Sequence, residues 1–429
     1  MAAPIDDARY FSTKLLDRYT LPSRESLVSF AADVTEHCSS QASDDDSSSE
    51  RHNLGSLYGD ALGPQVYVRL QWAIRRETSF DKRKNNLALA KKYAEESLEY
   101  TLASSSAKRR VALLESRWVG SMTMLIAIES RMENMENQRD QVCQQLLRRL
   151  TRNCQGLPSQ ECEVLYGRAG AIQAILWLRG ELQLPSMGRS FCLDMAEHVL
   201  QVGIDNASAA PQLQLPLVWY WYDKIYLGAA HGIVGILQTL LQLESKELIE
   251  LERRVPNALQ IMEQTIDALC QFYCFDESGN LMSSVGNNNK KDRLVHWCHG
   301  APGWILLLIL ASKVLSKPSN LELAKITAVQ TLWNRGLLKK GLGLCHGIAG
   351  NGFVLLRLSH ALEGDEQNLW YHRALQYASF GMAHYDRLKE IPDQPFSLYE
   401  GLSGFVCFLL ACADHNDSRS SQFPLYEFW

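Results

Sequence analysis

The sequence lacks a long run of apolar residues. Its longest uninterrupted apolar stretches, 304–311 and 405–413, are shorter than ten residues, whereas a helix that crosses a bilayer needs about 20. We therefore expect no transmembrane helix. The opening residues, MAAPIDDARYFSTKLL, also lack the basic start and apolar centre of a secretory signal. These absences predict a cytoplasmic protein, and they leave open a partly peripheral attachment to the plasma membrane.

Neither sign of charge is in large excess. The 43 Lys and Arg residues against 48 Asp and Glu residues give a net charge of −5, so we expect no nucleic-acid partner. The proportions of 46% apolar and 21% charged residues are those of an ordinary globular chain and exclude wholesale disorder. Residues 38–53, CSSQASDDDSSSERHN, have the composition of a disordered loop.

The cysteines show no disulfide framework. They number 11, an odd count, and are scattered along the chain. Without a secretory signal, this pattern favours free thiols in a reducing compartment.

Alternating strand patterns are scarce, and segments such as 84–102 carry apolar residues at helical spacing. We therefore expect an all-α fold. A Gly-x-x-Gly motif followed by an apolar helix also repeats along the chain. Clear copies begin at Gly167, Gly232, Gly300, Gly347 and Gly401, and weaker copies at Gly59 and Gly120. Each interval accommodates a helical hairpin, so about seven hairpins would stack into a closed ring or a solenoid.

Reactive side chains directly precede the first glycine in three consecutive copies. They are His231, the pair Cys298 and His299, and the pair Cys345 and His346. Taken singly, a cysteine or histidine is more often a packing residue. In superposed repeats, however, these positions meet near one end of the axis. Two thiolates and an imidazole suit Zn²⁺ and leave a fourth position open, as in catalytic sites. We predict Cys298, Cys345 and His346 as the metal ligands.

The motifs Trp297–Gly303 and Gly343–Gly352 resemble the signatures of lanthionine synthetase C-like (LanC-like) proteins, and Pro395–Gly401 resembles a further motif of that family. The resemblance covers about residues 54–415, and the overall pattern resembles eukaryotic members, the third type among them. It implies an α/α toroid of seven helical hairpins in two concentric layers over 54–415. We expect a helical segment and the Ser/Asp-rich loop before it, in residues 1–53, and a tail after it, in residues 416–429.

The resemblance also implies a chemistry. It implies one Zn²⁺ on Cys298, Cys345 and His346, an active-site role for His231, and recognition of glutathione or a substrate phosphate by Lys340. Members of the family add thiols to dehydroalanine or dehydrobutyrine, and eukaryotic members are associated with glutathione. We therefore expect glutathione and dehydroamino-acid-containing peptides or proteins as partners, with zinc turning a thiol into a thiolate and His231 moving a proton.

Some assignments and alternatives stay open. Arg9 and Arg387 are loose candidates for ligand contacts. An enzyme that forms thioethers is favoured, but a non-catalytic, zinc-containing adaptor that binds glutathione would carry the same motifs. A toroidal glycosidase would need two carboxylates, and the only acids in the motifs are Asp60 and Glu400.

Overall fold

The computed structural model describes residues 9–44, 56–59, 62–75, 79–103, 110–132, 136–275, 277–286 and 292–428. Helices make up most of this part of the chain. The described residues contain no strand and only isolated β-bridges, so the predicted all-α class is confirmed. Among them, no helix combines the length and apolar composition that a membrane span requires.

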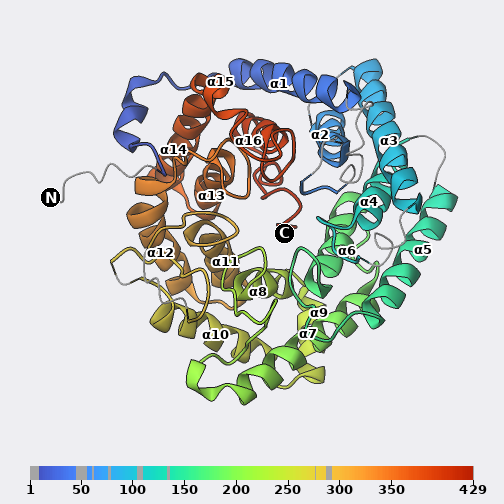
Figure 1. Cartoon of the computed structure of the whole chain (residues 1–429), viewed down its shortest axis with the longest axis vertical. Coiled ribbons are helices and arrows are strands. Elements are labelled where there is room, and N and C mark those ends of the chain that lie inside the picture. Colours follow the sequence, from blue (N-terminus) through green and yellow to red (C-terminus); the bar gives the residue numbers. More distant parts are fainter. Residues whose placement is uncertain are drawn as a thin grey trace.

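An inner ring of helices surrounds the axis of the molecule (Figure 1). Within the described residues it consists of α2 (Leu62–Arg75), α4 (Arg117–Glu129), α6 (Arg168–Leu182), α8 (Ile233–Leu241), α11 (Ala301–Val314), α13 (Ile348–Ala361) and α16 (Leu402–Ala413). Each of these helices contacts the next, and α16 contacts α2, so the repeats form a closed ring. Every residue of α8 is buried, because an inner helix has a neighbour on every side.

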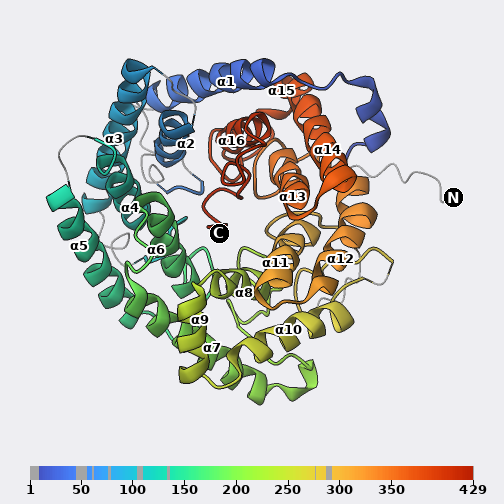
Figure 2. The same ribbon diagram turned by 180° about the vertical axis from the view of Figure 1, so that it is seen from behind.

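An outer layer covers this ring (Figure 2). It consists of α1 (Arg24–Asp44), α3 (Phe80–Ala103), α5 (Glu136–Gln155), α7 (Arg189–Ala209), α9 (Ser245–Arg254), α10 (Ala258–Phe272), α12 (Pro318–Thr327) and α14 (Gly364–Ala383). Shorter helical pieces are η1 (Thr13–Arg18), η5 (Pro211–Leu213), the π-helical η6 (Ala328–Trp333) and α15 (Tyr385–Leu388). Most inner helices pack against the outer helix that follows them in the chain, but α16 packs against α1 from the other end. The two concentric layers of the predicted toroid are confirmed.

The structure differs from the prediction of disorder over residues 38–44, where α1 continues to Asp44. Ser39 is buried and bonded there: its hydroxyl donates to Gln65 Oε1 at 3.0 Å and accepts from Arg69 Nη2 at 2.8 Å. Cys38 is buried beside it. Packing against α2 therefore keeps a polar segment helical. The remaining residues of the predicted loop, 45–53, lie outside the described residues.

In the five clear motif copies, a glycine in the first turn of the inner helix lies where the preceding loop passes very close. A Cβ atom added at Gly350 would lie 1.8 Å from the carbonyl oxygen of Leu344, six residues earlier. The second glycines of the other clear motif copies meet the carbonyl six residues earlier in the same way: Gly170, Gly235, Gly303 and Gly404. Real Cβ contacts are never this short, so the repeated glycine allows the loop and the first helical turn to pack together.

The end of the chain lies in the centre of the ring (Figure 1). Phe423 and Tyr426 are fully buried, and both pack on Trp297, with ring centroids 5.7 Å and 5.1 Å away. Glu427 forms an ion pair with Arg357 of α13 at 3.0 Å. Because Trp297 directly precedes Cys298, this final segment supports the loop that carries one of the predicted metal ligands.

Candidate metal centre

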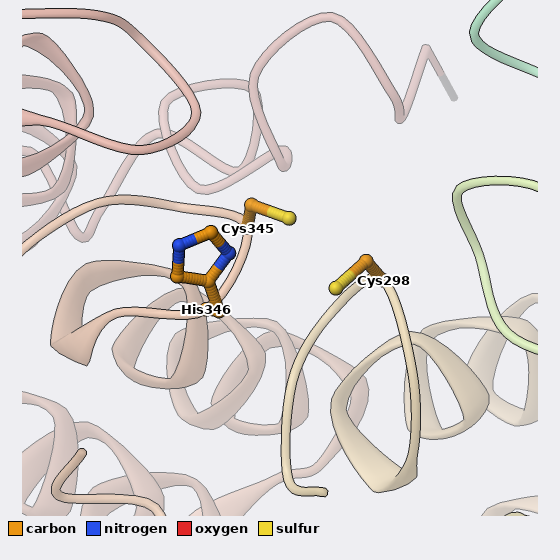
Figure 3. A group of neighbouring side chains, drawn as sticks. All are labelled: Cys298, Cys345 and His346. Atoms are coloured by element: carbon orange, nitrogen blue, oxygen red, sulfur yellow. The ribbon is translucent and has the colours of Figure 1, made fainter. Parts of the chain in front are cut away.

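The structure brings the three predicted ligands together. Cys298 lies in the loop before α11, and Cys345 and His346 lie in the loop before α13 (Figure 3). One ligand atom from each lies within 4.8 Å of the others, and no second such group of three His, Cys or acidic residues occurs in the described part of the chain. The backbone N–H of Cys298 donates to the Cys345 carbonyl at 3.4 Å, and that of Cys345 donates to the Tyr399 carbonyl at 2.6 Å. Neighbouring loops thus fix both thiols.

The chemistry of these donors fits a zinc ion. Tetrahedral zinc with Zn–S of about 2.3 Å and Zn–N of about 2.0 Å places its donors about 3.5–3.8 Å apart, which this group can reach. Both cysteines are buried, Cys345 at 2% and Cys298 at 9% exposure. Burial and the neighbouring Cys298 raise the pKa of the Cys345 thiol well above its usual range. A divalent cation would reverse that preference, since it deprotonates the thiol it binds.

A tyrosine from the first repeat completes the surroundings of Cys345. The Tyr58 hydroxyl lies 2.9 Å from Cys345 Sγ, and the Tyr58 ring stacks on Tyr399 with centroids 4.8 Å apart. Sequence reasoning treated this repeat as a weaker copy of the motif and missed the contact. The available signal was an aromatic residue directly before the glycine, as in the copy at Tyr166.

His231, in the loop before α8, is held by two residues that sequence reasoning missed. Its Nδ1 lies 2.9 Å from Glu163 Oε2, and Trp221 stacks on its ring with centroids 3.7 Å apart and planes 7° apart. Glu163 is itself held by the backbone N–H groups of Leu165 and Tyr166, which donate to its carboxylate. A carboxylate at Nδ1 places the imidazole proton there and leaves Nε2 to exchange protons. No local motif marked Glu163 or Trp221.

Basic side chains, Lys340 and Arg9 among them, lie around the candidate metal ligands. Burial, aided by His346, Lys340 and Arg9, lowers the pKa of His296 to about 3. Burial, followed by the neighbouring basic side chains of His231 and Lys340 among others, lowers the pKa of His299 to about 4. Lys340 is exposed, and its positive charge contributes to the lowered pKa of both histidines. The predicted residues His231 and Lys340 thus lie near the metal ligands.

The two arginine candidates differ in their surroundings. Arg9 donates from Nη1 to the Arg293 carbonyl at 3.0 Å, and its positive charge contributes to the lowered pKa of buried His296. The Arg387 guanidinium instead lies over the Phe11 ring, 5.2 Å from its centroid. The acidic candidates do not form a described pair, because Asp60 lies outside the described residues. Glu400 borders a small cavity of about 220 Å³ that Tyr58 also lines.

A larger cavity lies beside His231. Its volume is about 460 Å³, and it is lined by Arg110, Leu157, Pro158, Glu161, Tyr166, Trp221 and Tyr222. Trp221 and Tyr166 stack in parallel at 6.2 Å, so the aromatic wall is continuous with the His231 ring. A tight turn, in which Trp221 and Lys224 exchange backbone hydrogen bonds, holds Tyr222 80% exposed at the rim. The cavity size falls within the range of about 300–1,000 Å³ found for ligand sites.

Comparisons with known proteins agree on one family. A model of lanthionine synthetase C-like proteins matches residues 77–427. A zebrafish (Danio rerio) protein named glutathione S-transferase LANCL1 is 33% identical over 327 residues, which cover 74% of this chain and 76% of that protein. The Arabidopsis thaliana LanC-like protein GCL1 is 33% identical over 269 residues, 62% of this chain and 57% of that protein. The solved structure of nisin cyclase shares the fold, with a TM-score of 0.61 and 14% identity over 91% of this chain and 96% of that one.

Proposed function

The chain belongs to the lanthionine synthetase C-like family, and from this membership we propose that it is a zinc-dependent enzyme that adds the thiol of glutathione to dehydroalanine or dehydrobutyrine residues. The observation that carries the proposal is the meeting of two buried thiols and an imidazole near a histidine oriented by a carboxylate. The name of the zebrafish relative supports glutathione as the thiol. The third eukaryotic type and the cytoplasmic location stay predictions.

Three residues would hold the zinc ion: Cys298, Cys345 and His346. When bound, zinc would supply the positive charge that lowers the pKa of a thiol at the remaining tetrahedral position. The protein adds positive charge around this position. The positive charges of Lys340 and Arg9 both contribute to the lowered pKa of His296. The same charges would attract the carboxylates of glutathione.

The remaining chemistry belongs to the acceptor and His231. A bond forms between the glutathione sulfur and the β-carbon of the dehydroamino acid, and the electron pair of the double bond moves to the α-carbon. His231 Nε2 would take the thiol proton and return a proton to the α-carbon, so the product is a thioether and no oxidant is needed. Glu163 stabilises the protonated ring during this transfer. General acid–base help of this kind contributes about 10²–10⁴-fold.

The acceptor would approach through the 460 Å³ cavity, because Trp221, which lines this cavity, stacks on the His231 ring. An extended peptide can place a side chain against Tyr222 while its dehydroamino acid reaches the histidine. Tyr222→Ala should therefore raise the KM for a dehydroalanine peptide and leave that for N-acetyl-dehydroalanine amide unchanged. Equal KM changes for both acceptors would contradict this route.

The central experiment incubates the purified protein with a dehydroalanine peptide and glutathione and follows the thioether by mass spectrometry. We expect product with the zinc-containing protein, loss of product after chelation, and recovery after zinc is added back. Cys298→Ala and Cys345→Ala should lose both the metal and the activity. Product formation at the full rate by the chelated protein would contradict the proposal. Zinc-dependent glutathione binding without any product would instead support the non-catalytic adaptor.

A further inference from the structure

Tyr58 connects the first repeat of the ring to the candidate metal centre. Its hydroxyl lies 2.9 Å from Cys345 Sγ, although the two residues are 287 positions apart in the chain. Three contacts besides the hydroxyl hold the residue. Its backbone N–H donates to the Leu114 carbonyl at 3.1 Å, its carbonyl accepts from the Tyr399 N–H at 3.1 Å, and its ring stacks on Tyr399. These contacts involve the backbone and the ring, so they hold Tyr58 in place without the hydroxyl and direct the hydroxyl toward the sulfur.

The direction of this hydrogen bond follows from the chemistry of the two groups. A sulfur that ligates a metal is a thiolate and has no proton to give. A tyrosine hydroxyl carries a proton at neutral pH and can donate it. Tyr58 is thus the donor and Cys345 the acceptor. Groups that hydrogen-bond to metal ligands orient them and tune the metal.

We propose that Tyr58 is a positioning residue of the metal centre, whose hydroxyl holds Cys345 Sγ in its ligating orientation and withdraws electron density from that sulfur. The metal then receives less charge from Cys345 and stays more electrophilic toward a thiol ligand. This inference rests on the proposed metal site but not on the proposed reaction. It gives the weak first copy of the repeated motif a specific role.

The position of Tyr58 also links the metal to ring closure. Tyr58 precedes α2, Cys345 precedes α13, and Tyr399 precedes α16, the inner helix that contacts α2 and completes the ring. The contacts between Tyr58, Tyr399 and Cys345 therefore cross the seam between the first and last repeats. A metal bound to Cys345 favours the closed seam, because Tyr58 reaches the sulfur only when the ring is complete.

The test uses the full chain with cobalt(II) in the site, because thiolate-to-cobalt charge-transfer absorption reports the electron density on sulfur. Tyr58→Phe keeps the stacking ring and removes only the donor. We expect its charge-transfer band to move to lower energy than in the wild type, while the visible bands keep the intensity of tetrahedral cobalt. We also expect zinc affinity, measured by competition with a chelator, to fall by about 10–100-fold.

The matched control is Tyr399→Phe. It removes a hydroxyl from the same aromatic stack, but that hydroxyl donates to the Pro424 carbonyl at 2.8 Å and not to the sulfur. Its charge-transfer band should stay at the wild-type energy. A Tyr58→Phe band that also stays at the wild-type energy would overturn the proposal, whatever the zinc affinity.

A measurement on the wild type covers the case in which Tyr58→Phe fails to fold. With a spin-active cadmium isotope in the site, a hydroxyl proton that is hydrogen-bonded to a ligating sulfur is coupled to the metal nucleus. We expect a split hydroxyl resonance from Tyr58 that collapses to a single line with spin-free cadmium. The absence of a split hydroxyl resonance would overturn the proposal. Neither measurement uses the thioether assay, so a failed reaction and a failed inference remain distinguishable.

Discussion

At the scale of single residues, His231 shows how a reactive side chain depends on neighbours that need not touch the substrate. Glu163 bonds its Nδ1, and Trp221 stacks on one face of its ring. The first contact selects the tautomer, and the second restricts the rotation of the ring. Burial leaves Glu163 3% exposed, so little water competes for the carboxylate. The proton-transfer role proposed for His231 therefore rests on both contacts.

We expect His231→Asn to lower kcat by about 10²–10⁴-fold and to leave the zinc content unchanged. Glu163→Gln should lower kcat less, because it weakens the orientation of the ring but keeps the ring itself. Steady-state kinetics with a dehydroalanine peptide and metal analysis of each variant check this. The exposed His372 of α14 offers the control, since His372→Asn should have wild-type kinetics. Wild-type kcat in His231→Asn would remove this residue from the mechanism.

At the scale of elements, the first turn of the inner helix in each clear motif copy depends on a glycine for steric reasons. At Gly350 an added Cβ would overlap the backbone of the preceding loop, which carries Leu344 and leads into Cys345. Gly180 of α6 offers a contrast within the same layer, because nothing lies within 4 Å of its added Cβ. The tight packing beside the candidate metal centre, and not helix propensity, therefore explains why position 350 holds a glycine.

We expect Gly350→Ala to destabilise the protein by at least about 1–3 kcal/mol, because the loop must move to accept the methyl group. Gly180→Ala should instead stabilise it by up to about 1 kcal/mol, since alanine favours the helix. Urea unfolding of both variants measures the difference. Equal stability of the two variants would show that the close approach at Gly350 does not matter.

His360, near the end of α13, and His415, just after α16, form a pair of histidines that should make stability depend on pH. His360 and His415 have ring centroids 4.9 Å apart, and His360 Nε2 is buried with no hydrogen-bond partner among the described residues. Burial, then His415 and Arg357, lowers the pKa of His360 to about 4. The unfolded value is about 6.5, so between these values the unfolded chain binds more protons. Stability from His360 is thus present above about pH 6.5 and is lost as the pH falls toward 4.

His360→Gln should therefore make the unfolding free energy fall less steeply between about pH 6.5 and pH 4. Unfolding in urea at several pH values across this window provides the measurement. His372→Gln, at an exposed position on α14, is the control and should keep the wild-type slope. A wild-type slope in His360→Gln would contradict the assignment.

At the scale of the whole molecule, the two ends of the chain complete the ring. Helix α1 covers α16 on the outside, and the segment after α16 fills the centre (Figure 1). The central segment is held by the ion pair between Arg357 and Glu427, whose side chains are 4% and 0% exposed. The Glu427 carboxylate also accepts from the Phe423 N–H at 2.8 Å. Loss of this anchor would loosen the packing beneath Trp297 and hence beneath Cys298.

We expect Glu427→Gln to destabilise the protein by about 3–5 kcal/mol, because it removes the negative charge that is paired with the buried Arg357 guanidinium. The double variant Arg357→Met, Glu427→Gln should recover part of this loss. Glu250→Gln breaks the exposed pair with Arg253 and, as the control, should cost no more than about 1 kcal/mol. Thermal and urea unfolding distinguish these outcomes. A wild-type unfolding midpoint in Glu427→Gln would show that the anchor is dispensable.

The sequence by itself determined the helical class, the repeated hairpin and the three candidate metal ligands. The helical spacing of apolar residues and the repeated Gly-x-x-Gly motif are local patterns, and the structure confirms the all-α class that they predicted. Cys298, Cys345 and His346 could be singled out because they occupy the two positions before the first glycine of a repeated motif, and equivalent places in a closed ring converge. The resemblance to the LanC-like family added the two concentric layers.

Only the tertiary structure decided what surrounds those ligands. Glu163 meets His231 across 68 positions of the chain, and Tyr58 meets Cys345 across 287. No local pattern encodes such pairs, because each depends on how the ring closes. The same reason explains why helix α1 extends into a Ser/Asp-rich segment and why the end of the chain lies at the centre. Their neighbours come from distant repeats, and packing against those neighbours outweighs the preference of the local sequence.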